Sequence, residues 1–326
     1  MAAEPDDAGR DDAVVTVILL TYNHEQFIAE ALHGVFDQET PFAVELIVTE
    51  DHSTDDTLAV IDDVKAQTGR DFTVLSSPVN LCSNAVFRRA LDIAAGEFIA
   101  TLDGDDYWTD PHKLARQVEH LRKRPDLAMC FHDVVKVDEA TGAVVEETAL
   151  GTVELARCDL AQGNDIPGCS PVIRRACLEQ LPASFDDAEF GDWPLYLEAA
   201  RHGGVGGIGA TMGVYRLHDG GIWSGDRTEQ RDLQRLRFLN RLDPSVKRAC
   251  RDKWRRGRGF AMRKVAESLL EQGRRREAWP YAMRSIAAPG LPGFGRRDSV
   301  RMAALAASPR LVELARRARG WVRRWR

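Results

Sequence analysis

Short apolar runs alternate with amphipathic segments from Val14 onward, and this alternation limits the fold more than any other feature. The apolar runs cover residues 14–20, 44–49, 72–75, 98–102 and 127–135. In the segments between them, apolar residues recur at intervals of three and four, which is typical of helices that cover a sheet. Uninterrupted apolar strands separated by helices are typical of parallel sheets with both faces buried. The sequence therefore predicts an α/β fold with a mostly parallel, mixed sheet flanked by helices.

Polar residues mark where the predicted helices begin and end. Asp110 and Pro111 form a favourable N-cap and N1 pair for one helix, and Gly96 stands where a C-cap glycine would end the helix before it. Asp192 precedes another apolar helical segment, so we expect it at the N-cap.

Three polar clusters directly follow predicted strands. They are Thr21–Tyr22–Asn23, the segment 50–53 and the segment 103–106. Ligand sites in open α/β sheets lie beyond the carboxyl ends of the strands, where the connecting loops converge. We therefore expect the three clusters to lie at one edge of the sheet and to form a ligand site.

The third cluster carries three carboxylates within four residues, Asp103, Asp105 and Asp106. Carboxylates this close repel one another, and a hard divalent cation is one way to neutralise them. The alternative is a solvated acidic turn at the start of the next helix.

Several linked segments resemble family 2 glycosyltransferases of the GT-A fold. The segments are VILLTYN at 17–23, LIVTEDHSTDDT at 46–57 and GEFIATLDGDDYW at 96–108, and the resemblance covers about residues 14–225. It implies a GT-A type, Rossmann-like fold. It also implies that a sugar is transferred with inversion from a nucleotide diphosphate donor, with a UDP- or dTDP-sugar favoured, to an acceptor hydroxyl.

The resemblance implies roles for individual residues. It places the nucleotide-sugar donor on Thr21, Tyr22, Asn23, Asp51, Asn84, Asp103, Gly104, Trp108 and Arg216. It implies a bound Mn²⁺ or Mg²⁺ with ligands from Asp103, Asp105 and His218. Such an ion neutralises the charge that develops as the nucleotide leaves. Alternatively, Asn84 completes a turn, Trp108 packs in the core and His218 is an ordinary polar residue.

The same resemblance assigns the catalytic base to Asp192, within the segment Gly191–Asp192–Trp193. A base at this position takes the proton of the acceptor hydroxyl while its oxygen attacks the anomeric carbon. The alternative is that Asp192 only caps its helix.

Charge divides the chain into an acidic and a basic part. Residues 227–326 hold 28 Lys and Arg against 9 Asp and Glu, whereas residues 1–226 hold 16 against 41. We therefore expect a disordered acidic N-terminus at 1–13, a GT-A catalytic domain at 14–225 and a helical, Arg-rich C-terminal region at 226–326. Glycines at 257 and 273 and the segment 289–293 are expected to interrupt the helices of that region.

Residues 310–326 contain seven arginines and form a candidate basic amphipathic helix. Such a helix binds an anionic membrane surface or packs on the acidic part of the chain. The acidic start and the lack of a long apolar stretch predict a cytoplasmic protein, peripheral at the inner face of the membrane if the tail binds lipid. The acceptor is a glycan, a lipid-linked glycan or a small molecule.

Other functions remain as alternatives. A nucleotidyltransferase also uses an α/β fold with acidic metal ligands, but residues 17–23 lack the Gly-rich basic loop that binds a triphosphate. A non-catalytic protein that binds nucleic acid or membrane through the arginine-rich tail leaves the three carboxylate-bearing motifs unexplained, so we expect no nucleic-acid partner. A sugar-binding protein without turnover is disfavoured because Asp103, Asp105 and Asp192 are all present.

Overall fold

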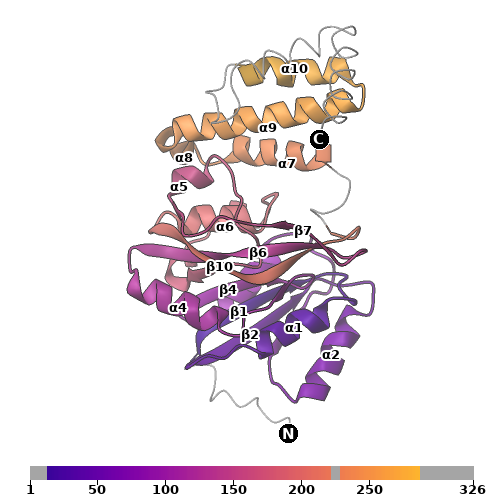
Figure 1. Cartoon of the computed structure of the whole chain (residues 1–326), viewed down its shortest axis with the longest axis vertical. Helices are drawn as coiled ribbons and strands as arrows, with labels where there is room; N and C mark the ends of the chain where they lie inside the picture. The colour runs from indigo at the N-terminus through magenta and orange to yellow at the C-terminus, as the bar shows by residue number, and fades with distance from the viewer. Residues whose placement is uncertain (1–12, 222–227, 287–326) are drawn as a thin grey trace. The chain divides into compact units, whose positions relative to one another are not determined.

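The computed structural model describes residues 13–221 and 228–286. The chain divides into two compact units, one of Met1–Leu160 and Asp165–Gly225 and the other of Ala161–Asn164 and Asp226–Arg326. Figure 1 labels helices and strands of both units. The predicted tail at 310–326 and the predicted N-terminal segment lie outside the described residues, except for Ala13, which begins the first strand.

The first unit has an α/β architecture. Its strands are β1 (Ala13–Thr21), β2 (Ala43–Glu50), β3 (Thr73–Ser76), β4 (Phe98–Asp103), β5 (Tyr107–Trp108), β6 (Leu127–Asp138), β7 (Ala143–Glu147), β8 (Glu154–Leu155), β9 (Val172–Arg174) and β10 (Gly204–Leu217). Its helices are α1 (Ile28–Phe36), α2 (Thr57–Thr68), α3 (Ala85–Ile93), α4 (Lys113–Lys123), α5 (Arg157–Leu160) and α6 (Asp192–Ala199), with 3₁₀ turns η2 (Arg175–Leu178) and η3 (Ala183–Phe185).

One mixed sheet runs through the first unit in the order β3-β2-β1-β4-β9-β6-β10-β5, while β7 pairs with β6 and β8 with β10. The strands β3, β2, β1 and β4 are mutually parallel, and β9 is antiparallel to both of its neighbours. The predicted fold class is thus confirmed.

The strand register brings the polar clusters to one edge of the sheet. Leu20 of β1 lies beside Asp103 of β4, and Thr21 lies beside Glu50 of β2. Because these strands are parallel and end at the same level, the loops that follow them converge at that edge. The strand β10 runs parallel to β6 and carries Leu217 beside Asp138.

Alternating residues of the central strands bury both faces of the sheet. Val15, Val17 and Leu19 of β1 share a core with residues of α1, α2 and α4. The helix α3 packs near β1 and β2, and α6 lies near β6 (Figure 1). Helices on both faces explain why the central strands read as uninterrupted apolar runs.

Two predicted helix ends are wrong in detail. The helix α4 begins at Lys113 with His112 at the N-cap, because Asp110 and Pro111 form a preceding turn in which Asp110 accepts the backbone N–H of His112 at 2.8 Å. The helix α3 ends at Ile93, three residues before Gly96.

Gly96 does not cap a helix but lies against Thr16 of β1. Its N–H donates to Thr16 Oγ1 at 2.9 Å, and a Cβ at this position would lie 2.4 Å from the backbone nitrogen of Thr16. Only glycine permits this close approach of the chain to β1.

The second unit is helical among its described residues, with α7 (Thr228–Arg241), α8 (Pro244–Ala249), α9 (Arg251–Glu271) and α10 (Arg275–Ile286). Val265, Leu269, Ala278 and Ala282 are in its core. The predicted interruption at Gly257 is wrong, since α9 continues through it and a Cβ there would lie 1.9 Å from the carbonyl oxygen of Gln162.

Gly273 does lie between two helices, with a left-handed φ of 80°. None of the helices among the described residues combines the length and the apolar character that spanning a membrane requires.

Candidate active site

The candidate site lies at the sheet edge where β1, β2 and β4 end. Asp103 is the last residue of β4, and the next residue, Gly104, donates its N–H to Leu20 O at 2.7 Å. A Cβ on Gly104 would lie 2.8 Å from both His24 Nδ1 and Thr21 Oγ1. The glycine therefore lets the loop after β4 pack directly on the loop after β1.

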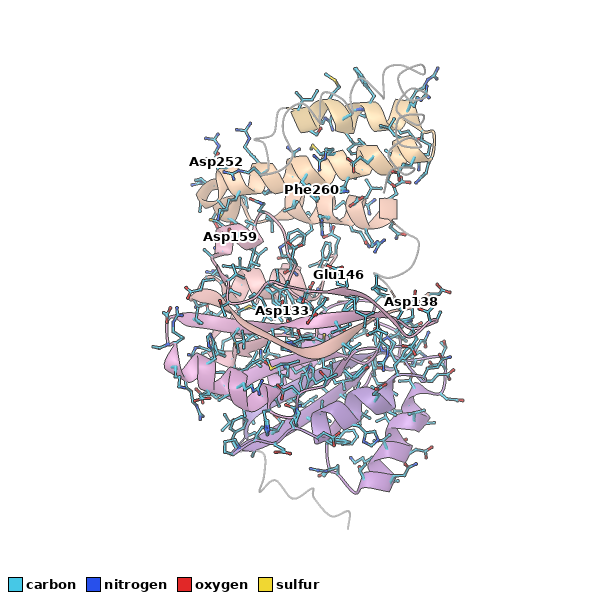
Figure 2. The ribbon with its side chains drawn as sticks, viewed as in Figure 1. Asp133, Asp138, Glu146, Asp159, Asp252 and Phe260 are labelled. Carbon is cyan, nitrogen blue, oxygen red and sulfur yellow. The ribbon has the colours of Figure 1, made fainter. Side chains whose placement is uncertain are left out.

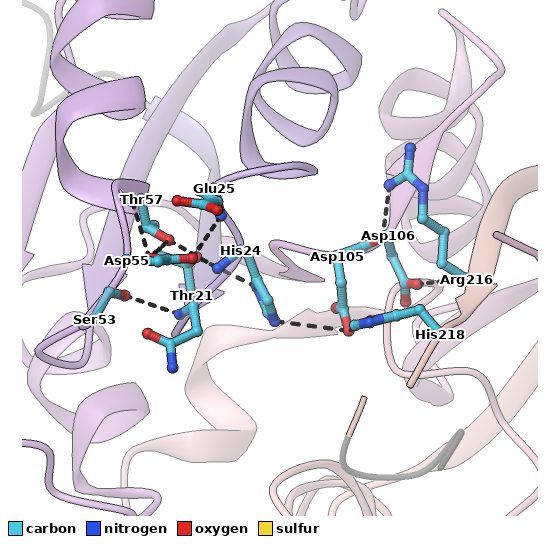
Figure 3. Close-up of polar contacts among 11 residues, drawn as sticks. Thr21, His24, Glu25, Ser53, Asp55, Thr57, Asp105, Asp106, Arg216 and His218 are labelled. Carbon is cyan, nitrogen blue, oxygen red and sulfur yellow. Dashed lines mark hydrogen bonds and ion pairs between the residues drawn. The ribbon is translucent and has the colours of Figure 1, made fainter. Parts of the chain in front are cut away.

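Asp105 lies between two histidines from distant parts of the chain (Figure 3). Its Oδ2 is 3.1 Å from Nε2 of His218 and 3.7 Å from Nε2 of His24. Burial alone would raise the pKa of Asp105, but the hydrogen bond with His218 and the electrostatic interactions with the two histidines hold that pKa below its ordinary value. Asp105 therefore remains an anionic oxygen donor.

His24 was not predicted as a site residue, although it follows Asn23 directly in the TYNH segment. Its Nδ1 lies 3.3 Å from Thr21 Oγ1, and its backbone N–H donates to Thr57 Oγ1 at 2.8 Å. Burial lowers the pKa of His24, which favours the neutral imidazole. No sequence pattern indicates a role for His24, because its partner Asp105 is 81 positions away.

Asp103 is affected by the two other key carboxylates. Burial, with the charges of Asp105 and Asp192, raises the pKa of Asp103 to about 8. Charges act on one another more strongly at short range, so this interaction favours a position of Asp192 near the cluster after β4. Asp103 ends β4, Asp105 lies in the loop after it and Asp192 interacts electrostatically with Asp103, while the predicted role of Asp192 as the base stays a prediction.

Asp106 and Arg216 connect the loop after β4 to β10. Asp106 is buried, and its Oδ1 accepts the backbone N–H of Arg216 at 2.9 Å. The guanidinium of Arg216 donates to the carbonyl oxygen of Asp105 at 2.6 Å and pairs with Glu30 and Glu139. Arg216 is only 5% exposed, so it holds this loop in place, and its predicted contact with phosphate stays a prediction.

The loops after β1 and β2 bind each other. Asn23 Oδ1 accepts the backbone N–H of Thr54 at 2.8 Å, and Ser53 Oγ accepts that of Asn23 at 2.9 Å. Asn23 and His52 both adopt left-handed φ angles, of 55° and 61°. Such conformations are uncommon outside glycine and concentrate at functional sites.

Asp51 and Asn84, both predicted to contact the donor, form hydrogen bonds with backbone groups through their side chains. Asp51 accepts the N–H groups of Leu81 and Cys82 at 2.9 and 3.1 Å. Asn84 donates to the carbonyl oxygens of Phe185 and Phe190, each at 2.8 Å. The carboxylate of Asp51 has further lone pairs for a ligand, whereas both contacts of Asn84 are to the loop before α6.

Two aromatic residues of the prediction have different surroundings. Trp108 is 4% exposed, donates from Nε1 to Cys169 O at 2.8 Å and carries Lys113 Nζ 3.8 Å above its ring. These contacts agree with the packing alternative. Tyr22, by contrast, is 40% exposed in the loop after β1.

Asp192 is the first residue of α6, and the predicted N-cap position is wrong. Gly191 occupies the N-cap and provides no side-chain bond, because the helix begins one residue earlier than the capping preference implies. Asp192 Oδ1 accepts the N–H of Trp193 at 2.6 Å. Trp193 is buried and donates from Nε1 to Leu160 O at 2.7 Å, which fixes the start of the helix.

A pocket of about 480 Å³ opens beside the Asp105 and His218 pair. Its lining residues are Asn23, Glu25, Gln26, Phe27, Asp55, Asp138, Glu139, Ala140, Leu217, His218, Asp219 and Gly220. Asp138 ends β6 at this edge of the sheet (Figure 2). The pocket is therefore formed by the loops after β1, β2, β6 and β10.

The donor atoms at this edge fit a divalent cation that also binds an outside ligand. Among the described residues, no three His, Cys, Asp or Glu side chains already surround a common point. Asp105 and His218 are 3.1 Å apart, as expected for two adjacent ligands of an octahedral ion with bonds of about 2.1 Å. Asp106 Oδ2 is buried without a hydrogen-bond partner in the described part of the chain, beside mutually repelling carboxylates. Phosphate oxygens would complete such a site.

Known proteins of similar sequence include sugar transferases. An uncharacterized protein of Mycobacterium tuberculosis is 35% identical over 225 residues, 68% of this chain and 64% of that protein. The chain thus spans less than two thirds of the length of that relative. A UDP-Glc:alpha-D-GlcNAc-diphosphoundecaprenol beta-1,3-glucosyltransferase of Escherichia coli is 34% identical over 64% of this chain and 79% of its own length.

Solved structures share the fold. TarS 1–349 of S. aureus in complex with UDP-GlcNAc superposes with a TM-score of 0.57 at 16% identity, covering 89% of this chain and 90% of that one. A mannosyltransferase of Pyrobaculum calidifontis in complex with GDP-Man and Mn²⁺ gives 0.53 at 17% identity, covering 95% and 85%. The sequence profile described as Glycosyl transferase family 2 matches residues 16–181, half of the chain. The protein therefore belongs to glycosyl transferase family 2.

Proposed function

We propose that this protein transfers a sugar, with inversion, from a nucleotide diphosphate donor to an acceptor hydroxyl. The observation that carries the proposal is the pair of Asp105 and His218, 3.1 Å apart beside a pocket at the edge where β1 and β4 end, in a chain of glycosyl transferase family 2. A single displacement needs a site for the diphosphate and one base on the acceptor side. Asp105 and His218 would hold the cation that binds the diphosphate, and Asp192, whose charge contributes to the raised pKa of Asp103, is proposed as the base.

The donor is proposed to lie over the loops after β1, β2 and β4. Thr21, Tyr22 and Asn23 line the nucleotide side, Asp51 faces the base, and Asp103 with Gly104 lies near the ribose. A UDP-sugar is favoured because the E. coli relative uses UDP-Glc and TarS was solved with UDP-GlcNAc. The complex of the P. calidifontis enzyme with GDP-Man keeps a guanosine donor as the alternative.

Asp105 and His218 are proposed to hold Mn²⁺ or Mg²⁺, with Asp103 near them. When bound, the ion supplies charge neutralisation for the leaving diphosphate. His24 Nε2 lies 3.7 Å from the same oxygen of Asp105. Arg216 donates a hydrogen bond to the carbonyl oxygen of Asp105 and so holds the segment that carries Asp103 and Asp105.

Asp192 is proposed to act as the base. It accepts the proton of the acceptor hydroxyl while the acceptor oxygen bonds to the anomeric carbon and the bond to the diphosphate breaks. Inversion follows, because the oxygen attacks from the face opposite to the leaving group. The rigid start of α6, held by Trp193, fixes the carboxylate for this step.

The acceptor is proposed to be a glycan, with a lipid-linked glycan favoured over a small molecule. By its name, the E. coli relative adds glucose to a sugar on diphosphoundecaprenol. A basic tail that binds anionic lipid would bring the protein to such an acceptor, which places it at the inner face of the membrane.

A thermal-shift screen tests the proposal. A ligand that binds only the folded state raises the melting temperature. UDP, UDP-Glc, UDP-GlcNAc and GDP-Man are added with and without Mn²⁺. We expect a UDP compound to raise the melting temperature more with Mn²⁺ than without it, and Asp105→Asn to remove that difference. Equal shifts in the two proteins would overturn the assignment of the cation site.

A further inference from the structure

A short segment at the start of α3 holds the loop that leads to Asp192. Ser83 Oγ donates to Asp186 O at 2.7 Å, and the backbone N–H of Asn84 donates to the same oxygen at 3.0 Å. The residues joined lie about a hundred positions apart in the sequence. The loop before α6 is therefore fixed by α3 rather than by its own neighbours in sequence.

Asn84 makes most of this connection through one side-chain amide. Its Nδ2 lies 2.8 Å from both Phe185 O and Phe190 O, and 3.5 Å from Ala188 O. A Cβ on Gly191 would lie 3.3 Å from Asn84 Oδ1, so the amide is against the residue directly before Asp192. The amide of Asn84 thus contacts carbonyl oxygens along the loop from residue 185 to residue 190.

Arg88 holds the other end of the same loop. Its Nε donates to Asp186 Oδ1 at 2.7 Å, and its Nη2 donates to Pro182 O at 2.9 Å. Its guanidinium also lies 5.6 Å from the centroid of the Phe185 ring. A planar guanidinium with three such partners restricts both rotation and translation of the loop.

The segment that carries Asn84 and Arg88 is itself fixed on the donor side. Asp51 accepts the N–H groups of Leu81 and Cys82, and Cys82 has a left-handed φ of 45°. The residues 81–88 therefore connect the carboxylate proposed to face the nucleotide base with the loop that carries the proposed catalytic base.

We propose that Asn84 and Arg88 are positioning residues that fix Asp192 relative to the donor. The inference rests on the proposed role of Asp192 and changes the predicted role of Asn84 from donor contact to loop anchor. A catalytic group must be held within about 0.5 Å of its working position, and a displacement of about 1 Å costs on the order of 100-fold in rate. Loss of either anchor is therefore a loss of kcat more than of donor binding.

The neighbouring Arg89 offers a matched control on the same helix. It donates from Nη1 to Ser77 Oγ at 2.8 Å and from Nη2 to Ser76 O at 3.2 Å, so it binds the end of β3. Arg88→Ala and Arg89→Ala remove the same side chain one residue apart. Asn84→Asp keeps the shape of the side chain and replaces the N–H donors with an anion facing carbonyl oxygens.

Hydrogen exchange of the peptide 183–192 measures the anchoring without any turnover. We expect exchange about tenfold faster in Arg88→Ala and Asn84→Asp than in wild type, and unchanged exchange in Arg89→Ala. With UDP-Glc or UDP-GlcNAc, Mn²⁺ and water as the acceptor, we expect kcat of donor hydrolysis to fall about 10- to 100-fold in the first two proteins. The dissociation constant of UDP should stay within about threefold in all three.

Two results would overturn the inference. One is unchanged exchange of 183–192 in both anchor variants, and the other is an equal fall of kcat in Arg88→Ala and Arg89→Ala. Failure of the proposed function has a different signature, since wild-type protein would then turn over none of the sugar nucleotides. Arg88→Lys serves as the rescue variant, and we expect it to recover part of kcat through one remaining bond to Asp186.

Discussion

The Nε2 atom of His218 lies 3.1 Å from Oδ2 of Asp105, although the two residues are 113 positions apart. His218 follows the end of β10, and Asp105 follows the end of β4. Two residues before His218, Arg216 holds the carbonyl of Asp105. The strand β10, which comes last in the sequence among the described strands, therefore adds Arg216 and His218 to the site at the ends of β1 and β4.

The first prediction concerns this pair. Replacing His218 by Ala removes one of the two proposed metal ligands. Loss of a residue that only hydrogen-bonds to a metal ligand already lowers metal affinity about 10- to 100-fold, so we expect the affinity for Mn²⁺ in the presence of UDP to fall by at least that factor. Calorimetric titration of Mn²⁺ measures it. His202→Ala is the control, because His202 is exposed in the turn after α6. Equal Mn²⁺ affinity in wild type and His218→Ala would contradict the proposed ligand.

The second prediction concerns Asp192. Asp192→Asn keeps the shape of the side chain and removes its basicity, so we expect the transfer rate to fall about 10²- to 10⁴-fold while the dissociation constant of UDP is unchanged. Rapid-quench assays with UDP-Glc or UDP-GlcNAc, Mn²⁺ and water as the acceptor measure the rate, and UDP titrations measure the dissociation constant. Asp187→Asn is the matched control, since Asp187 is exposed in the same loop. A variant at position 192 that retains transfer would rule out the base.

Much of the site was predictable because parallel strands deliver their carboxyl ends to one edge. The apolar runs predicted the strands β1, β2 and β4, and the polar residues after them predicted that Asn23 and Asp105 lie at the same edge. Pairings over long distances were not predictable. His24 meets Asp105 only after β4 is inserted beside β1, and nothing in the local sequence of either residue encodes that neighbour.

The wrong predictions of helix caps at Asp192 and Gly96, and the unexpected contacts of Asn84, have a related cause. Capping preferences pointed to Asp192 and to Gly96, but tertiary contacts decided both positions. The buried Trp193 sets the start of α6, and the close approach to Thr16 requires Gly96. Asn84 matched a donor-loop pattern, yet its amide is engaged by a loop a hundred residues later. Local propensity describes an isolated segment, whereas packing selects among its alternatives.

The third prediction concerns Gly96. In Gly96→Ala the added Cβ would meet the backbone nitrogen of Thr16 at 2.4 Å, and backbone cannot move away as a flexible side chain can. We expect the free energy of unfolding to fall by about 1–3 kcal/mol, as measured by urea denaturation. Gly163→Ala is the control, because nothing lies within 4 Å of its Cβ position. Similar stability of the two variants would show that β1 and the segment before β4 can separate at little cost.

The fourth prediction concerns the buried amine of Lys113. The side chain is 0% exposed, and Nζ lacks a hydrogen-bond partner among the described residues, although it lies over the Trp108 ring. Burial lowers the pKa of Lys113 from the ordinary 10.5 of a lysine to about 7. Between these two pH values the unfolded chain binds the proton that the folded chain has lost. The free energy of unfolding contributed by this group therefore rises with pH across that window.

Below pH 7 the amine is protonated in both states, so the full cost of burying the charge is present there. Lys113→Met removes that cost and keeps an unbranched chain in the same space, so we expect the variant to be more stable than wild type by about 2–4 kcal/mol at pH 6, after the lost contact with the Trp108 ring is subtracted. The difference should shrink toward pH 9. Urea denaturation at pH 6, 7.5 and 9 measures it, with the exposed Lys123→Met on the same helix as control. A difference that is constant across this range would show that Lys113 keeps its ordinary pKa in the folded protein, because only a shifted pKa makes the benefit of removing the amine depend on pH.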